Sequence, residues 1–231
     1  MAAVMIVVVP SRGRPGNIQE LIESFWQTCR ANTHLWVCVD EDDPELEGYR
    51  EAVNGACLSA VRLIVGEPSR IGPILNRVVP QAAAEAPYVA FMGDDHRPRT
   101  VAWDQLYINN LRDMGTGVVY GNDLYQGVNI PTQVAMTSNI VLATGYFVPP
   151  GAKHLYLDNM WADIGRATKL RYLNDVVVEH MHPCAGKAEW DEGYANNNSV
   201  ATYSEDEAIY LAWKENDLLD WADKIRTYNG V

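Results

Sequence analysis

Two adjacent carboxylates, Asp94 and Asp95, follow the apolar run at residues 88–92 after one glycine, and His96 comes next. Neighbouring carboxylates repel each other unless a positive charge offsets the repulsion. Mg²⁺ and Mn²⁺ prefer oxygen ligands, so a bound divalent ion would supply that charge. The sequence therefore predicts a divalent-metal site here, and the alternative is that the two acids only cap a helix or form a turn.

Two histidines, His180 and His182, end another apolar segment at residues 170–179. On an extended chain, residues two apart face the same side. Imidazole beside carboxylate suits Mn²⁺ and similar ions. We expect one of the two histidines to be a metal ligand and favour His182, while the other packs in the interior or bonds to the backbone.

These side chains must be positioned by the ends of strands. Apolar runs at 4–9, 35–39, 61–65 and 88–92 predict strands, and helical spacing at 17–30, 45–58 and 72–84 separates them. This alternation predicts a parallel sheet covered by helices, in which ligands bind outside the carboxyl ends of the strands. Asp40 ends the second strand, so it should converge on one crevice with Asp94 and Asp95. For the acids at 40–43 a solvated turn explains the pattern equally well.

The second half of the chain has a different rhythm. It predicts helices at 100–114 and 158–169, strands at 117–120, 134–142 and 170–179, and a Pro/Gly-rich loop at 145–154. A polar loop is expected at 186–203, followed by one or two helices at 204–228 with Ser204 as the cap. Without a repeat, linker or low-complexity tract, we expect one domain spanning 1–231.

The composition limits the classes of function. The formal net charge of −12 argues against non-specific coating of nucleic acid or anionic membrane. The four cysteines form no CxxC pair, which favours reduced thiols. The apolar run at 4–9 is too short for a signal peptide or membrane span, so we expect a cytoplasmic protein with no membrane partner. The chain also lacks a dinucleotide fingerprint, a Walker loop, GxSxG and HExxH.

A set of short motifs, taken in order, resembles the GT-A glycosyltransferases, most closely the family 2-like group and its small phage-encoded members. The motifs lie at residues 7–15, 37–40, 71–77, 91–96, 143–147 and 158–159, with His182 after them. The resemblance implies a GT-A, Rossmann-like α/β fold. It has a mostly parallel central sheet flanked by helices, a smaller antiparallel acceptor-side sheet and C-terminal helices. It further implies a nucleotide-sugar-binding half at 1–99, an acceptor and catalytic half at 100–185, and a variable region at 186–231.

The resemblance also implies roles for individual residues. Donor contacts would come from Pro10, Ser11, Arg12, Asp40, Arg70, Gly72, Asn76 and Asp94. Asp95 and His182 would hold Mn²⁺ or Mg²⁺, and Asp158 would be the general base. The implied reaction is metal-dependent and inverting, and it moves a sugar from a nucleoside diphosphate sugar, foremost a UDP-sugar, to an acceptor hydroxyl. The acceptor would be a small molecule, a glycan, a protein or a modified DNA base.

Several alternatives stay open. The same chemistry on hydroxymethylated bases of phage DNA, in the host cytoplasm, would need a local basic strip. The candidates for that strip are Arg97, Arg99, Arg112, Lys153, Arg166, Lys169, Arg171 and Lys187. The basic, glycine-containing segment at 11–16 partly fits a nucleotidyltransferase. Leu75 and Asn159 replace an Arg and an acid of the family pattern, which fits a catalytically degenerate nucleotide-binding domain.

Three aromatic residues complete the predictions. Trp161 lies on a predicted helix, where a core position is expected. Trp190 and Tyr194 lie in the polar segment at 186–203, where an aromatic ring has less core to join. We therefore expect these two to belong to a lid or to contact the acceptor.

Overall fold

The computed structural model describes residues 2–56, 60–190 and 199–230. Within them an eight-stranded sheet has the order β3-β2-β1-β4-β7-β6-β8-β5. The strands are β1 Met5–Ser11, β2 Thr33–Asp40, β3 Val61–Gly66, β4 Tyr88–Phe91, β5 His96–Pro98, β6 Val118–Asn122, β7 Val134–Thr137 and β8 Leu170–His180. β3, β2, β1 and β4 are parallel, as are β6 and β8, whereas β7 and β5 run antiparallel to their neighbours. The expected α/β architecture with a mostly parallel sheet is confirmed.

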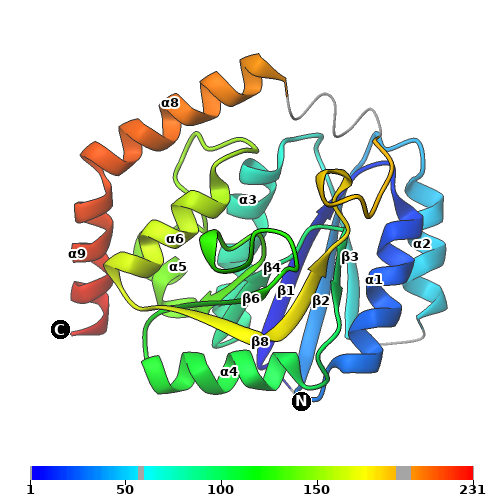
Figure 1. Ribbon diagram of the computed structural model, residues 1–231, viewed down its shortest axis with the longest axis horizontal. Coiled ribbons are helices and arrows are strands. Elements are labelled where there is room, and N and C mark those ends of the chain that lie inside the picture. The colour runs from blue at the N-terminus through cyan, green and yellow to red at the C-terminus, as the bar shows by residue number, and fades with distance from the viewer. Residues whose placement is uncertain (1, 57–59, 191–198, 231) are drawn as a thin grey trace.

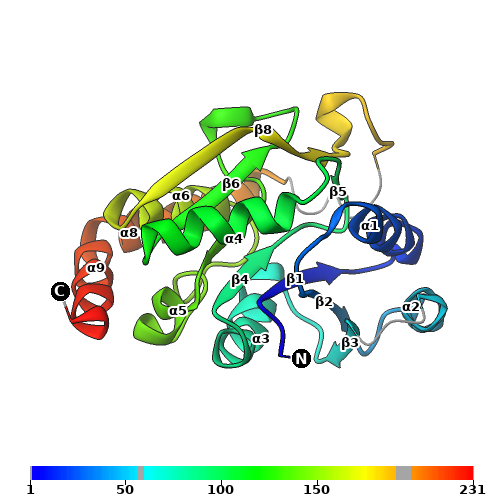
Figure 2. The same ribbon diagram turned by 90° about the horizontal axis from the view of Figure 1, so that it is seen from below.

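Helices cover both faces of this sheet (Figures 1 and 2). They are α1 Pro15–Thr28, α2 Leu46–Gly55, α3 Ile71–Glu85, α4 Trp103–Met114, α5 Ser138–Thr144, α6 Leu157–Ala167, α8 Val200–Asn216 and α9 Leu218–Asn229. Short 3₁₀ turns occur at Gly127–Asn129 and Pro183–Ala185. In the part of the chain that is described, none of these helices is both long enough and apolar enough to cross a membrane.

The residues of β1 show how the two faces are filled. All seven are buried, as expected for a central parallel strand. Met5 and Val7 share a hydrophobic cluster with α1, α2 and α4. Ile6 and Val8 share a second cluster with α3, α5, α6, α8 and α9. Figure 2 shows this arrangement edge-on, with α1 above the strands and α3 below them.

The segment at 134–142 does not form the single strand that its apolar run predicts, so that prediction is wrong. The strand ends at Thr137, and α5 begins at Ser138. The Ser138 hydroxyl donates to the Ala86 carbonyl at 2.5 Å, and the Ser138 amide donates to Pro87 at 3.0 Å. These bonds turn the chain onto the sheet, where Ile140 and Val141 are buried, so tertiary contacts override the strand propensity of this apolar run.

The start of the C-terminal helical region also differs from expectation. Residues 191–198 of the predicted loop lie outside the described residues, but Val200 to Tyr203 already belong to α8. The cap is Ser199 and not Ser204, because the Ser199 side chain accepts a hydrogen bond from the Thr202 amide at 3.2 Å. A second helix, α9, follows directly after Asp217.

Candidate functional site

A cleft of about 1260 Å³ lies at the carboxyl ends of the parallel strands. In Figure 1 the arrowheads of β1 and β8 point toward this end of the sheet. All but two of the predicted site residues line the cleft, namely Pro10, Ser11, Arg12, Asp40, Arg70, Asp94, Asp95, Asp158 and His182. Strand ends that share one edge of the sheet therefore bring together residues that are far apart in sequence, as expected for this class of sheet.

Gly72 and Asn76 are the two predicted donor contacts that are not among the lining residues. The Gly72 amide donates to the Lys153 carbonyl at 2.8 Å. The Asn76 carbonyl oxygen accepts from the amides of Phe147 and Val148 at 3.0 and 3.1 Å. Both residues thus fix the loop between α5 and α6 against α3, and they support the cleft wall from behind.

Replacing Gly72 with alanine should destabilise the fold by about 1–3 kcal/mol, the usual range for forcing extra atoms into a packed site. A Cβ at Gly72 would lie 2.1 Å from the backbone oxygen of Ala152, which is so close that the backbone would have to shift. Gly16→Ala in α1 is the matched control, because a Cβ there meets nothing within 4 Å. Urea unfolding monitored by circular dichroism measures both variants. Equal stability of the two would contradict the close approach of α3 to this loop.

Arg12 and Asp40 are joined to each other in the cleft. An Arg12 guanidinium nitrogen lies 2.7 Å from the Asp40 carboxylate and 2.5 Å from that of Asp42. These two partners raise the pKa of Arg12 further above its ordinary value. Asp40 also accepts a bond from the Ser69 amide at 3.2 Å, so it links the ends of β1 and β2 to the segment before α3. Arg14 and Arg70 are the other guanidinium groups that line the cleft.

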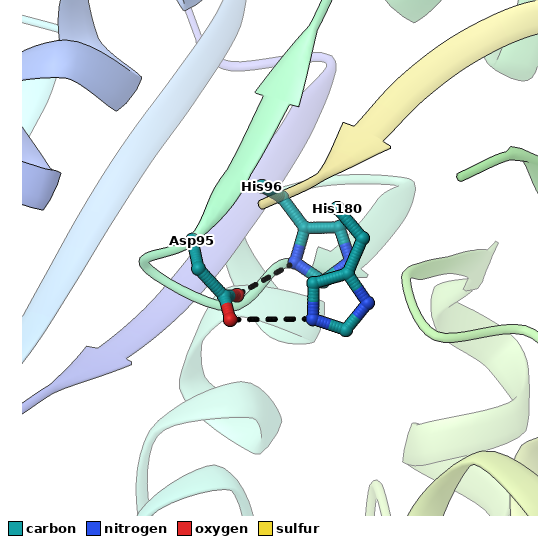
Figure 3. Close-up of side chains that lie close together, drawn as sticks. All are labelled: Asp95, His96 and His180. Carbon is teal, nitrogen blue, oxygen red and sulfur yellow. Dashed lines mark hydrogen bonds and ion pairs between the residues drawn. The ribbon is translucent and has the colours of Figure 1, made fainter. Parts of the chain in front are cut away.

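Asp94 and Asp95 lie in different surroundings although they are adjacent. Asp94 accepts a short hydrogen bond of 2.6 Å from the Ser11 hydroxyl and lies 3.4 Å from Arg14. Asp95 points toward two imidazole rings, with His180 Nε2 at 3.2 Å and His96 Nδ1 at 3.4 Å (Figure 3). The antiparallel pairing of β5 with β8 places His96 opposite His180, and their rings stack with centroids 4.3 Å apart.

The charges of this cluster follow from those contacts. Burial and the neighbouring charge of Asp95 raise the pKa of Asp94 to about 6. Burial opposes ionisation of Asp95, but the charge of His180 and its hydrogen bond to Asp95 lower the pKa of Asp95 well below its usual range. Burial also disfavours the charged form of His180, but Asp95 and Asp123 outweigh it and raise the pKa of His180 to about 9. At neutral pH the cluster therefore carries a positive charge directly beside Asp95.

The donor set of this cluster fits a divalent metal ion. One ligand atom from each of Asp95, His96 and His180 lies within 4.8 Å of the others. Among the described residues His180 Nδ1 is buried without a hydrogen-bond partner, and it lies 3.8 Å from the Asp123 carboxylate. A cation that replaces the proton of His180 would be balanced by the same carboxylates. His96 is 2% exposed and its Nδ1 accepts from the Gly93 amide, so it supports the His180 ring from behind.

His182 lies beside the cluster. Its ring centroid is 5.0 Å from that of His180, and its Nδ1 accepts from the Cys184 amide at 3.1 Å. The ring also stacks on Tyr125, with centroids 5.6 Å apart. The structure thus brings His180, the other histidine of the predicted pair, to Asp95. The assignment of His182 as the ligand stays a prediction, while the geometry favours His180.

Asp158 lines the same cleft. It is the second residue of α6, and the following amide of Asn159 donates to its carboxylate at 3.1 Å. Burial raises the pKa of Asp158 to about 6. A carboxyl group with that pKa is ionised at neutral pH and remains basic enough to accept a proton from a reacting hydroxyl.

The fold agrees with that of solved nucleotide-sugar transferases. A mannosyltransferase from Pyrobaculum calidifontis, solved with GDP-Man and Mn²⁺, is 14% identical with a TM-score of 0.63, over 99% of this chain and 74% of that one. TarS 1–349 from S. aureus, solved with UDP, is 14% identical with a TM-score of 0.59, over 76% of this chain. The chain has the GT-A fold.

A further structure with this fold is glucosyl-3-phosphoglycerate synthase from Mycobacterium tuberculosis, solved with Mn²⁺, UDP and glucosyl-3-phosphoglycerate. It is 13% identical with a TM-score of 0.58, over 88% of this chain and 78% of that one. The matched region spans only 59% of the TarS fragment. No family model and no curated protein matches the sequence. At these identities the GT-A fold is shown, whereas similarity to phage-encoded members stays a prediction.

Sequence reasoning missed Asp123, a carboxylate that is not among the lining residues of the cleft but lies beside His180, which is. It accepts hydrogen bonds from the amides of Tyr125, Gln126 and Gly127 at 2.8–3.0 Å, and from Thr132. Burial opposes ionisation of Asp123, but the neighbouring His180 and these hydrogen bonds lower the pKa of Asp123 far below its usual range. An aspartate followed four residues later by glycine is a turn signal, so the loop was detectable, but its approach to His180 was not.

The predicted aromatic residues occupy different places in this GT-A fold. Trp161 is 1% exposed and packs on Phe91 with ring centroids 4.8 Å apart, so its expected core position is confirmed. Trp190 is 57% exposed and its ring lies 6.4 Å from that of His182. Tyr194 lies outside the described residues. Trp190 therefore lies beside a lining residue of the cleft, and its role in a lid or an acceptor contact stays a prediction.

Proposed function

We propose that this chain is a glycosyltransferase that moves a sugar from a nucleoside diphosphate sugar to an acceptor hydroxyl, with Mn²⁺ or Mg²⁺ as cofactor. One observation carries the proposal. A buried carboxylate beside two imidazoles, Asp95, and a carboxylate with a raised pKa, Asp158, line the same cleft at the strand ends of a GT-A fold. That pairing provides a place for a metal-bound diphosphate and a base for the acceptor. A UDP-sugar is the donor we expect first.

In the proposed mechanism each residue has a defined task. Asp40 and Ser11 hold the nucleoside end of the donor, and Arg70 and Arg14 face the diphosphate, since guanidinium groups match phosphate oxygens. A divalent ion held by Asp95 and His180 would neutralise charge on the leaving diphosphate. Asp158 accepts the proton of the acceptor hydroxyl as that oxygen attacks the anomeric carbon. Attack from the side opposite the diphosphate inverts the configuration at that carbon.

Donor binding is the first test of this function. A panel of UDP-, GDP-, CDP- and ADP-sugars, each with and without Mn²⁺, is screened by thermal shift. A donor at 100 times its Kd should stabilise the folded protein by about 2.7 kcal/mol, and the shift should require the metal. If no donor raises the Tm in either condition, a catalytically degenerate domain or a function unrelated to sugar transfer is favoured instead.

We expect substitutions of His180 and His182 to affect Mn²⁺ affinity differently. His180→Ala should weaken Mn²⁺ binding by about tenfold or more, because its ring contacts Asp95 at 3.2 Å. His182→Ala should change Mn²⁺ affinity by less than about threefold, because its Nδ1 is bonded to the Cys184 amide. Isothermal titration with Mn²⁺ measures both variants. The opposite order of effects would restore His182 as the ligand.

The alternative with DNA as acceptor finds little support in the charges of the candidate strip. Each of five candidates pairs with a carboxylate, namely Arg97, Arg99, Lys153, Arg166 and Lys187. Arg97 is also 4% exposed. Paired cations neutralise fewer phosphates, and binding to DNA depends on that neutralisation. A nucleotidyltransferase would release pyrophosphate from a nucleoside triphosphate, so product analysis separates it from the transferase.

A further inference from the structure

The chain enters α6 through an uncommon backbone conformation. Residues 154–158 line the cleft consecutively and end at Asp158. Tyr156, the residue just before α6, has φ of +62°, in the left-handed region that bulky residues rarely adopt. Such a conformation persists only where surrounding contacts hold it in place. The orientation of Asp158 after this turn therefore depends on the contacts that hold residues 154–156 in place.

Residues 154 and 155 are held by hydrogen bonds to one buried carboxylate of α8. Asp206 is 1% exposed, and its Oδ2 accepts hydrogen bonds from the amides of His154 and Leu155 at 3.1 and 2.7 Å. Its other oxygen, Oδ1, is buried without a partner among the described residues. Burying a carboxylate is unfavourable unless hydrogen bonds compensate it. Both hydrogen bonds that the Asp206 carboxylate accepts therefore come from consecutive backbone amides of the cleft wall.

Other residues of α8 fix the same segment. The Tyr156 ring stacks on that of Tyr210 at 5.6 Å, and its hydroxyl donates to Glu207 at 3.1 Å. Asp163, one and a half turns along α6 from Asp158, accepts from the Tyr210 hydroxyl and lies 2.8 Å from Lys214 Nζ. In Figure 1, α8 lies along the outer side of α6. The turn and the helix that carries Asp158 are thus both fastened to α8.

We infer that Asp206 is a positioning residue for Asp158: from α8 it holds the cleft wall at 154–156, and so sets where the carboxylate of Asp158 meets the acceptor. The inference rests on the proposed function, because it assigns Asp158 as the base. It also gives α8, which lies in the region that the sequence motifs leave unassigned, a part in the reaction. Ser199, Thr202 and Tyr203 at the start of α8 line the same cleft, which supports that part.

The first measurement is amide hydrogen exchange with mass spectrometry, which needs no substrate. In Asp206→Ala the amides of His154 and Leu155 lose their acceptor, so exchange across 154–158 should accelerate about tenfold or more. Exchange in β1 should stay as in the wild type, which shows that the fold is retained. Glu205→Gln is the matched control, because it removes only the exposed Lys153–Glu205 ion pair on the same turn of α8.

The second measurement is turnover. With water as the acceptor, its oxygen bonds to the anomeric carbon, the carbon–diphosphate bond breaks, the nucleoside diphosphate leaves, and Asp158 takes the proton. Asp206→Ala should lower the kcat of this release about 10- to 100-fold, since small misplacements of a catalytic group have effects of that size. The donor Kd should stay within about twofold. Asp206→Asn keeps a carbonyl oxygen for the two amides, so its kcat should stay within about threefold of wild type.

The outcomes separate this inference from the proposed function. Unchanged exchange at 154–158 in Asp206→Ala, or faster exchange with unchanged kcat, overturns the role of Asp206. An equal loss in Glu205→Gln, or no recovery in Asp206→Asn, overturns it as well. If the wild-type protein binds no nucleotide sugar, the proposed function fails, and the exchange rates still decide whether Asp206 fixes this segment.

Discussion

Asp158→Asn is expected to lower kcat about 10²- to 10⁴-fold while the donor Kd stays within about twofold, because general-base catalysis contributes rate accelerations of that size. Asparagine keeps the shape of the side chain, but its neutral amide cannot accept the proton. Asp158 lies in the first turn of α6 and lines the same cleft as Asp95. Stopped assays of nucleoside diphosphate release, with the donor identified by thermal shift, measure the loss. Asn159→Ala is the control, because Asn159 is adjacent but is not among the lining residues.

The pH dependence gives a second signature of the same base. Since burial raises the pKa of Asp158 to about 6, wild-type turnover should rise about tenfold per pH unit below that value and level off above it. Asp158→Asn should lack this limb. A wild-type profile that is flat between pH 5 and about 7, or an Asn variant of near-normal rate, would show that another group takes the proton.

Stability should change in the opposite direction from activity. The folded-state pKa of about 6 lies above the ordinary value of 3.8, so the unfolded chain releases this proton at lower pH than the folded protein does. The contribution of Asp158 to stability is therefore full below about pH 4 and is lost as the pH rises through 6. Asp158→Asn avoids that loss and should raise the Tm at pH 8. A higher Tm with lower turnover would exclude unfolding as the reason for lost activity.

The sequence located the cleft because its residues follow strands. Runs of β-branched residues identify buried strands, and acids placed after such runs must lie at the carboxyl edge of the sheet. Asp40, Asp94 and Asp95 were found in this way, and all three are buried at that edge. The motif resemblance added Asp158, whose place on a helix has no such local signal. Gly72 and Asn76 share the segment with Arg70, but the helical turn points them at the loop at 147–153.

The residues that sequence reasoning could not find are those whose deciding partners lie far away in the chain. Asp206 stands between Glu205 and Glu207 in a polar helix, where a solvated face is the natural expectation. Its two hydrogen bonds join residues about fifty positions apart in the chain. Asp123 likewise approaches His180 only because β8 pairs with β6 in the sheet. Periodicity and spacing describe local structure, so contacts made by tertiary packing leave no trace in them.

Asp95→Ala should abolish the part of donor binding that depends on metal. In the wild type the donor Kd is expected to be about 100-fold or more weaker with EDTA than with Mn²⁺, and in the variant the two values should become equal. Asp95 is the carboxylate shared by His96 and His180, at 3.4 and 3.2 Å, so its loss leaves the cluster without its oxygen ligand. Isothermal titration with the donor in both conditions measures the ratio.

Asp94→Asn is the matched comparison, because it changes the neighbouring residue by the same loss of charge. The Asp94 carboxylate accepts a hydrogen bond from the Ser11 hydroxyl and lies beside Arg14. Its substitution should therefore alter donor affinity in both conditions alike and leave the Mn²⁺-to-EDTA ratio near the wild-type value. A ratio that survives in Asp95→Ala but collapses in Asp94→Asn would exchange the roles of the two acids. The expected difference between these adjacent acids comes from their different partners. Asp95 contacts histidines of β5 and β8, whereas Asp94 contacts Ser11 at the end of β1 and Arg14 in the loop after it.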